Sequence, residues 1–247
     1  MIYVERVEPS DDFEKEAVAW MQTWQTNHPQ KTTSQFWNLI RQRKAMKKFA
    51  KVLVAMFYGK CAFCESTIGH IAHPHIEHFY PKSRTEFQHL MFAWENWLIA
   101  CPICNQNKRT KFPMCDDLPC LINPTKDSPS EHVDFIGTNI LSKTKRGRKT
   151  IEIIGLNRTD LGNQRSFWLM TINSLLVIMC RVPKLKQDIR EFLIWAMQSN
   201  APYCAMTKAY LSKKVPKLAN PKIPHAQIEM DDPSTKISIL LDKSLYK

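Results

Sequence analysis

The chain has 247 residues, of which 44% are apolar and 23% charged, with 35 basic and 23 acidic side chains and a formal net charge of +12. This length supplies one large domain or two small ones with a buried core, which excludes disorder as a description of the whole chain. The apolar runs are far shorter than the ~20 residues that cross a bilayer, so neither a membrane span nor a membrane partner is expected. The positive charge favours a polyanionic partner, with nucleic acid as the first candidate.

The first 59 residues predict mainly helices. A short alternating segment, Met1–Val7, precedes a helix over 13–26 and a second helix from Thr33 or Ser34 to Gly59. The outward face of the second helix is basic, which is typical either of a solvated helix face or of a phosphate-facing stripe. Its residues are Arg41, Arg43, Lys44, Lys47, Lys48 and Lys51. The first 30 residues are acidic and contain no secretion signal, so a cytoplasmic location is expected.

Two CxxC pairs, Cys61/Cys64 and Cys101/Cys104, have 36 residues between them. Two such knuckles typically close a tetrahedral four-thiolate zinc site, and a closed site of this kind stabilises structure and does not catalyse. A redox-active CxxC, or coincidence in a cysteine-rich chain, is the alternative reading.

The other four cysteines lack this spacing, and a disulfide framework is not expected in a reducing compartment. Cys180 and Cys204 are predicted to be buried small apolar residues, whereas Cys115 and Cys120 are left open to a minor metal or surface role.

Between the cysteine pairs, the segment 74–83 predicts a short strand that enters a turn at Pro81. The segment 94–100 predicts a second strand leading into the second CxxC, and 104–109 begins a helix. Two strands and a helix joined by zinc would bring His78, Asn96 and Asn105 toward one cleft, as a metal-assisted nuclease requires.

The rest of the chain, 113–247, predicts an irregular proline-rich connection followed by short strands near 131–135 and 150–154 on either side of a basic turn. Three amphipathic helices follow, over 160–180, 185–199 and 201–212. The tail from Val215 is punctuated by prolines and predicts either an extended arm or a segment that is partly ordered by a partner.

At the cysteine-enclosed segment the sequence resembles the HNH endonucleases, whose fold is a ββα-metal unit. By that resemblance Glu77 is the acidic ligand of a catalytic Mg²⁺ or Mn²⁺ and His78 is the general base that deprotonates the attacking water. Asn96 fixes the loop that holds the base, Asn105 is the second metal ligand, and Lys108 is a basic residue near the scissile phosphate. Two positions depart from the commonest pattern, because the acidic residue is Glu and the last residue is Asn.

The chemistry of these residue types agrees with that assignment. Carboxylate and amide oxygens are hard ligands suited to Mg²⁺, and a neutral histidine can take a proton from water. A core or zinc-proximal histidine is the alternative for His78. The basic side chains and one histidine around the unit are the predicted nucleic-acid contacts: His75, Lys82, Arg84, Lys108, Arg109 and Lys111.

A narrower resemblance, to the PtuB family of HNH subunits from Septu-type phage defence, extends over about residues 1–200. It is carried by Met1–Val7, Cys61–Glu65, Glu77–Ser83, Leu121–Pro124 with His132, and Ile151–Arg158 with Arg165. The family implies an ABC/SMC-like ATPase partner of the PtuA type, and in retron versions a reverse transcriptase with its DNA–RNA hybrid.

The sequence therefore predicts an α+β, mainly α-helical protein in which a zinc-stapled ββα-metal (HNH) core is embedded in helices. The predicted regions are an N-terminal helical region (1–59), the nuclease core (60–112) and a C-terminal region (113–247). The predicted function is a metal-dependent endonuclease of an antiphage defence complex, acting on DNA or RNA. The alternatives are a non-catalytic zinc-stapled module that binds nucleic acid and an HNH nuclease that acts alone.

Overall fold

The computed structural model describes residues 1–69 and 74–215. The predicted proline-rich arm lies outside these ranges apart from Val215. A search of the described helices finds none with both the length and the hydropathy that crossing a membrane requires.

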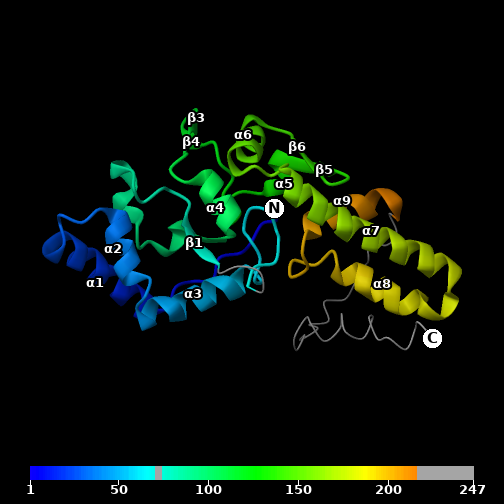
Figure 1. Ribbon diagram of the computed structural model, residues 1–247, viewed down its shortest axis with the longest axis horizontal. Coiled ribbons are helices and arrows are strands. Elements are labelled where there is room, and N and C mark those ends of the chain that lie inside the picture. The colour runs from blue at the N-terminus through cyan, green and yellow to red at the C-terminus, as the bar shows by residue number, and fades with distance from the viewer. Residues whose placement is uncertain (70–73, 216–247) are drawn as a thin grey trace.

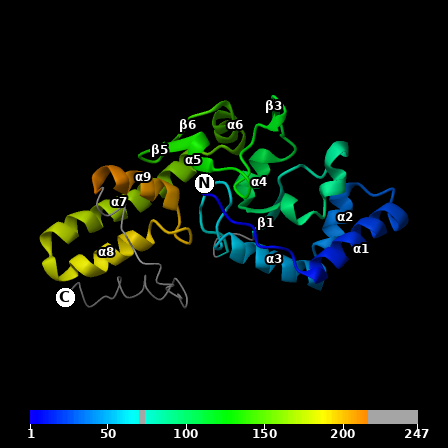
Figure 2. The ribbon, with the colours of Figure 1, turned by 180° about the vertical axis from the view of Figure 1, so that it is seen from behind.

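The molecule is elongated, with helices at both ends and a small mixed region between them (Figures 1 and 2). One end is formed by α1 (Asp11–Asn27), α2 (Thr33–Ile40) and α3 (Lys44–Met56). The middle contains β1 (His75–His78), η1 (Thr85–Leu90), η2 (Trp94–Asn96), β2 (Trp97–Ala100), α4 (Pro102–Lys108), β3 (Met114–Cys115), β4 (Leu118–Pro119), α5 (Pro129–His132), β5 (Val133–Ile136), β6 (Asn139–Ser142) and α6 (Lys145–Ile154). The other end consists of α7 (Thr159–Arg181), η3 (Pro183–Leu185), α8 (Lys186–Trp195) and α9 (Cys204–Lys214). Mostly helical structure with small antiparallel sheets is consistent with the predicted α+β class.

The predicted single helix from residue 33 to 59 is wrong, because the chain forms two helices separated at 41–43. In α2 the buried side chains include Phe36 and Ile40, and in α3 they include Phe49 and Leu53. At about 100° per residue, these two buried stripes would point to roughly opposite sides of one continuous helix. The break allows both helices to face the same core.

Strands β1 and β2 form an antiparallel pair in which His75 lies opposite Ala100 and His78 opposite Trp97. Helix α4 follows β2 directly, with Pro102 in its first turn and the Cys101 sulfur accepting a hydrogen bond from the Cys104 N–H. Proline is favoured at this position because the first-turn N–H groups have no partner within the helix. The chain therefore runs from β1 to β2 and then, through Cys101, into α4, which contains Cys104.

The strand predicted near 150–154 is also wrong, because these residues complete helix α6, while β5 and β6 form a hairpin before it. The Thr144 side chain caps α6 at the Gly147 N–H, and Gly155 ends it in the left-handed conformation at φ 69°. A Cβ at Gly147 would lie 2.0 Å from the His132 carbonyl oxygen, so glycine is required for α6 to pack this closely. These local contacts outweigh the strand preference of the β-branched residues in 150–154.

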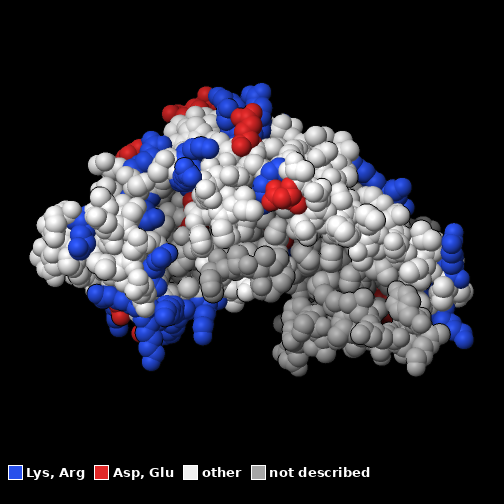
Figure 3. All heavy atoms as spheres, viewed as in Figure 1, with Lys and Arg blue, Asp and Glu red and all other residues white. Residues whose placement is uncertain are grey.

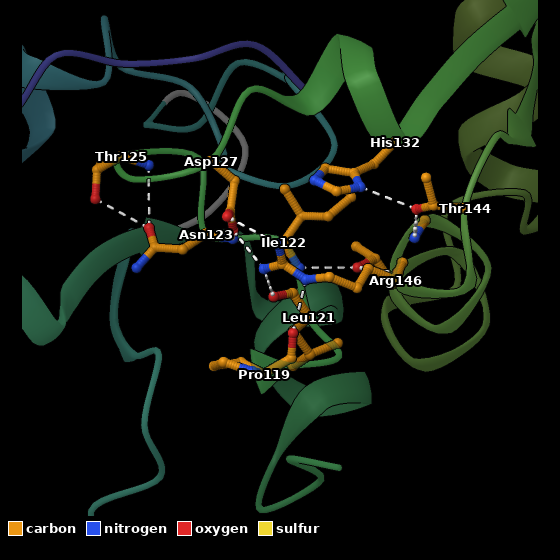
Figure 4. A network of polar contacts seen from close by, with 11 residues as sticks. Pro119, Leu121, Ile122, Asn123, Thr125, Asp127, His132, Thr144 and Arg146 are labelled. Carbon is orange, nitrogen blue, oxygen red and sulfur yellow. Dashed lines mark hydrogen bonds and ion pairs between the residues drawn. The ribbon is translucent and has the colours of Figure 1, made fainter. Parts of the chain in front are cut away.

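Arg146 of α6 ties the irregular segment 119–127 to this helix (Figure 4). Its guanidinium pairs with both carboxylate oxygens of Asp127 and also donates to the backbone carbonyls of Pro119 and Leu121. Two-pronged guanidinium–carboxylate pairing fixes orientation as well as distance. A long connection rich in proline is thereby held in one conformation.

The N-terminal segment is not a strand but crosses the middle of the molecule. The Val4 N–H donates to the Pro124 carbonyl at 2.8 Å, and Arg6 donates to the carbonyls of Trp94 and Trp97. Arg6 also reaches Thr125, so this segment connects 121–125 with the start of β2.

The main core includes buried side chains from α1–α3, from the β1–β2–α4 unit and from α6, and thus extends across both predicted region boundaries. A second, smaller core lies between α7, α8 and α9 around Ile172, Leu193 and Leu211. The division at 59/60 and 112/113 stays a prediction from composition.

The cysteines outside the CxxC pairs differ in part from the expectation. Cys115 and Cys120 form a disulfide across the β3–β4 hairpin, a pairing that the sequence interpretation did not expect. Cys180 is exposed on α7, so its predicted burial is wrong. The predicted burial of Cys204 is confirmed.

Candidate active site and metal centre

The four cysteines of the CxxC pairs converge on one point. Their sulfur atoms all lie within 4.8 Å of one another, and Cys64 and Cys101 are 3.9 Å apart. Sulfurs ~2.3 Å from a tetrahedral zinc ion are ~3.8 Å apart, so this cluster has the size and donor set that zinc requires. Cys61, Cys64, Cys101 and Cys104 could therefore bind zinc.

Cationic and polar groups surround this cluster. The Arg158 guanidinium donates to the Cys104 sulfur at 3.6 Å, and Ser66 Oγ lies 3.3 Å from the Cys64 sulfur. Burial lowers the pKa of Arg158, but the Cys104 and Cys64 sulfurs together with the Asp160 carboxylate outweigh that effect and raise the pKa above its ordinary value. A positive charge at this position favours thiolates over thiols, which is the form that binds metal.

Glu65, directly after the first CxxC, links the cluster to the C-terminal helices. Its buried carboxylate pairs with the amino group of Met1 and accepts a hydrogen bond from Cys204 at the start of α9. Burial raises its pKa, but the Met1 ammonium, the charge of Lys60 and the hydrogen bond from Cys204 together outweigh burial and lower the pKa to about 2. Glu65 is thus ionised and holds three distant segments together.

His78 ends strand β1 with its ring buried. Its Nε2 lies 2.9 Å from the Met91 carbonyl oxygen, and because a carbonyl only accepts, Nε2 must donate. The lone pair of the neutral ring is therefore on Nδ1, to which no residue in 1–69 or 74–215 hydrogen-bonds. This is the tautomer in which Nδ1 can accept a proton.

Two tryptophans hold the His78 ring. The Trp37 ring centroid lies 4.5 Å away in an edge-on arrangement, and Trp97 lies 6.4 Å away. Burial lowers the pKa of His78 well below its ordinary value, and the charge of Lys82 lowers it further. The ring is therefore neutral at physiological pH, as a general base must be.

Asn96 holds the loop between His78 and β2. Its amide oxygen accepts from the Tyr80 N–H at 2.7 Å, and its amide nitrogen donates to the carbonyls of Tyr80 and Leu90. The Met91 carbonyl, which follows Leu90, accepts from both His78 and Trp97. Asn96 therefore fixes the backbone that orients His78, and is itself buried.

Glu77 and Lys108 form a buried ion pair. The Lys108 ammonium lies 2.6 Å from Glu77 Oε1 and 2.8 Å from the His78 carbonyl. Burial raises the pKa of Glu77 and lowers that of Lys108, while their mutual attraction opposes both shifts. Lys108 is 0% exposed and paired with Glu77, so it is not available for the predicted contact with nucleic acid near the scissile phosphate.

Asn105 lies on α4 beside strand β1. Its amide nitrogen donates to Nδ1 of His75 at 2.8 Å. Within the described ranges its amide oxygen accepts no hydrogen bond, which leaves the hard donor of this side chain for a ligand.

A cleft of about 710 Å³ brings these residues together between the N-terminal helices and the β1–β2–α4 unit. Six of the predicted site residues line it: His75, Glu77, His78, Lys82, Asn105 and Arg109. Asn96 lies behind it as a support. The other predicted contacts lie elsewhere, since Arg84 pairs with Glu86 and the exposed Lys111 does not line the cleft.

Several residues of this site were missed from the sequence. Trp37 packs on His78, and Arg41 and Lys47 line the opposite wall of the cleft. The basic residues of 41–51 were the sequence signal for this wall. From the sequence alone, however, a solvated helix face could not be distinguished from a phosphate-facing stripe. No sequence signal marks a backbone carbonyl such as that of Met91.

The chain is similar to three proteins with related names. Over 143 residues it is 32% identical to Septu protein PtuB of Bacillus mycoides (strain KBAB4), covering 47% of this chain and 48% of that protein. Over 109 residues it is 31% identical to Septu protein PtuB of Bacillus thuringiensis, covering 44% and 40%. Over 211 residues it is 27% identical to Septu protein PtuA of the same B. mycoides strain, covering 74% of this chain and 28% of that protein.

The matched parts span about half the length of the first PtuB protein and two-fifths of the second. A comparison with protein-family models finds no match. The chain is therefore PtuB-like in part of its sequence.

Proposed function

We propose that this protein is a metal-dependent endonuclease that hydrolyses phosphodiester bonds as a component of a Septu-type antiphage defence system. The observation that carries the proposal is the cleft, where a histidine with an available Nδ1 lone pair lies beside a carboxylate and an amide oxygen under basic side chains. The similarity to two proteins named Septu protein PtuB supports the biological setting.

His78 performs the proton transfer. Its Nδ1 takes a proton from a water molecule, and the water oxygen forms a bond to phosphorus while the bond to the leaving oxygen of the nucleotide breaks. The Met91 carbonyl keeps the ring in the required tautomer, and Trp37 and Trp97 keep it in place. Asn96 acts through this backbone as a positioning residue.

Glu77 and Asn105 are the residues that would hold a Mg²⁺ or Mn²⁺ ion, because they offer hard oxygen donors in one cleft. Such an ion would stabilise the negative charge that develops on the phosphate and leaving oxygens. Lys108 keeps Glu77 ionised and oriented. The four-cysteine cluster would hold zinc and maintain the position of α4 against the strands.

The main alternative is a module that binds nucleic acid without cutting it. Such a module would share the zinc site and the positive charge. It would not need a buried histidine whose tautomer is fixed so that the Nδ1 lone pair can accept a proton. The orientation of His78 therefore favours the enzyme.

The proposed partner is a PtuA-like ATPase. In a retron version, a reverse transcriptase with its DNA–RNA hybrid would bind to the complex of this protein and the ATPase. A nuclease that acts alone is the second candidate for the biology. The similarity to a protein named Septu protein PtuA supports a Septu setting for the chain.

The test is cleavage of duplex DNA, single-stranded DNA and structured RNA by the full chain, alone and co-purified with its neighbouring gene products. We expect products with added Mg²⁺ or Mn²⁺ and none with Ca²⁺. Binding of these substrates without cleavage under every metal condition would leave only the binding module.

A further inference from the structure

The cleft has two walls, and only one belongs to the β1–β2–α4 unit. That wall carries Glu77, His78 and Asn105, while the facing wall is built from α2, α3 and the turn between them, with Trp37, Arg41 and Lys47. We infer that the α2–α3 wall is a second phosphate-binding surface, which holds a nucleic-acid strand against the hydrolytic residues. This inference rests on the proposed function and extends the substrate site to helices outside the HNH-like segment.

The charge of the cleft lining carries the argument. Its basic residues are Arg41, Lys47, Lys82 and Arg109, and Glu77, its only acidic residue within the described ranges, is already paired with Lys108. In the described part of the chain, Arg41, Lys47 and Arg109 form no ion pair. Unpaired cations on both walls of a cleft attract a polyanion more strongly than cations on one flat face.

The basic face of α3 is divided by the fold. Lys47 faces the cleft, whereas Lys48 pairs with Asp12 of α1, and Lys44 and Lys51 are exposed away from the cleft lining. Figure 3 shows Lys and Arg side chains gathered at the α2–α3 end of the molecule. The basic residues of 41–51 therefore divide into two groups. Arg41 and Lys47 face the cleft and are the phosphate-facing residues, whereas Lys44 and Lys51 belong to a solvated helix face.

Lys82 connects the two walls. It follows strand β1 and the Pro81 turn, and its ammonium lies 5.5 Å from the centre of the Trp37 ring on α2. Trp37 also packs on His78, so a strand drawn onto the α2–α3 wall would lie next to the general base.

The test compares two double variants of equal charge. Arg41→Gln with Lys47→Gln removes the cations of the wall, and Lys44→Gln with Lys51→Gln removes two exposed lysines of α3. Binding of labelled duplex DNA, single-stranded DNA and structured RNA to the full chain is measured by fluorescence anisotropy, with Ca²⁺ in place of Mg²⁺, over a range of salt concentrations.

We expect the cleft variant to bind more weakly, with a slope of log affinity against log salt that is smaller by roughly 1.8 for duplex DNA and 1.4 for single strands. The control variant should keep the wild-type slope. Equal losses in both variants, or none in either, would overturn the inference. If the cleft variant binds with wild-type affinity and still cleaves, only this inference is overturned. If the cleft variant binds more weakly but the wild-type protein never cleaves, only the proposed nuclease activity is overturned.

Discussion

Lys108 occupies a position that its sequence context did not indicate. A buried ammonium between the Glu77 carboxylate and the His78 carbonyl orients both neighbours in the site. The pair is deeply buried, and a buried pair is costly to break because one charge is left without its partner.

Lys108→Met is therefore expected to lower the free energy of unfolding by about 3–5 kcal/mol, since it leaves Glu77 buried and unpaired. Adding Glu77→Gln should restore part of that loss. Urea unfolding of both variants measures this coupling, with the exposed Lys111→Met as control. A Lys108→Met protein as stable as the control would contradict the buried pair.

Asn96→Ala should destabilise the loop that supports His78. Its removal leaves the Tyr80 N–H and the Tyr80 and Leu90 carbonyls without their side-chain partner. Three groups lose their partner and each unsatisfied buried group costs about 1–3 kcal/mol, so we expect a loss of at least about 3 kcal/mol. Thermal unfolding should show it, while Asn163→Ala, at an exposed position on α7, should unfold as the wild type does.

The metal-binding cysteines of the site could be predicted because metal ligation requires particular residue types at particular spacings. Cys61, Cys64, Cys101 and Cys104 were predicted from spacing alone, and their convergence agrees. Their partners could not be predicted in the same way. Arg158 reaches Cys104 across 54 positions of the chain, and long-range contacts of this kind depend on the fold.

At the scale of elements, the cysteine cluster connects the turn before β1 to the start of α4. Zinc binding to such a cluster contributes directly to the free energy of folding. Loss of the metal should therefore loosen the strand–strand–helix unit rather than remove a catalytic group.

Cys101→Ser should weaken zinc binding and lower the melting temperature, because three thiolates bind zinc less tightly than four and the α4 cap is changed. Metal analysis and thermal unfolding measure both effects. Cys180→Ser, at an exposed position on α7, should keep zinc and stability. Zinc-free, fully folded wild-type protein would rule out the metal centre.

The two errors in element prediction have a common physical cause. Apolar residues recur at helical spacing on both sides of 41–43, but the two stripes are out of phase, and packing of both on one core requires a break between them. The β-branched residues of 150–154 favour a strand, but the caps and the close packing of α6 outweigh that preference. The signals that remained local, such as the Thr144 cap and Gly155, correctly mark the ends of α6.

At the scale of the whole molecule, the helices beyond the candidate site are extensive. Large apolar side chains on α7 remain exposed, among them Phe167 and Met170 at 70% and 65%. Exposed apolar side chains on one helix are typical of a protein-binding surface. This agrees with the proposed docking of the chain on a partner protein.

We expect the chain to co-elute with a PtuA-like ATPase when the two are co-expressed and separated by size-exclusion chromatography. Phe167→Ser with Met170→Ser should weaken that complex without changing zinc content, and Tyr3→Ser, an exposed aromatic residue elsewhere, serves as control. Separate peaks for the wild-type proteins at micromolar concentration, with nucleotide present, would favour a nuclease that acts alone.

The central claim is that His78 is the general base of phosphodiester hydrolysis. Its most direct test is the single-turnover cleavage rate of His78→Ala and His78→Asn against wild type and His89→Ala, an exposed histidine outside the cleft. We predict a loss of at least ~10²–10⁴-fold for both His78 variants, with zinc content and partner binding unchanged, and no loss for His89→Ala. Cleavage at the wild-type rate by a folded His78→Ala protein would contradict the account.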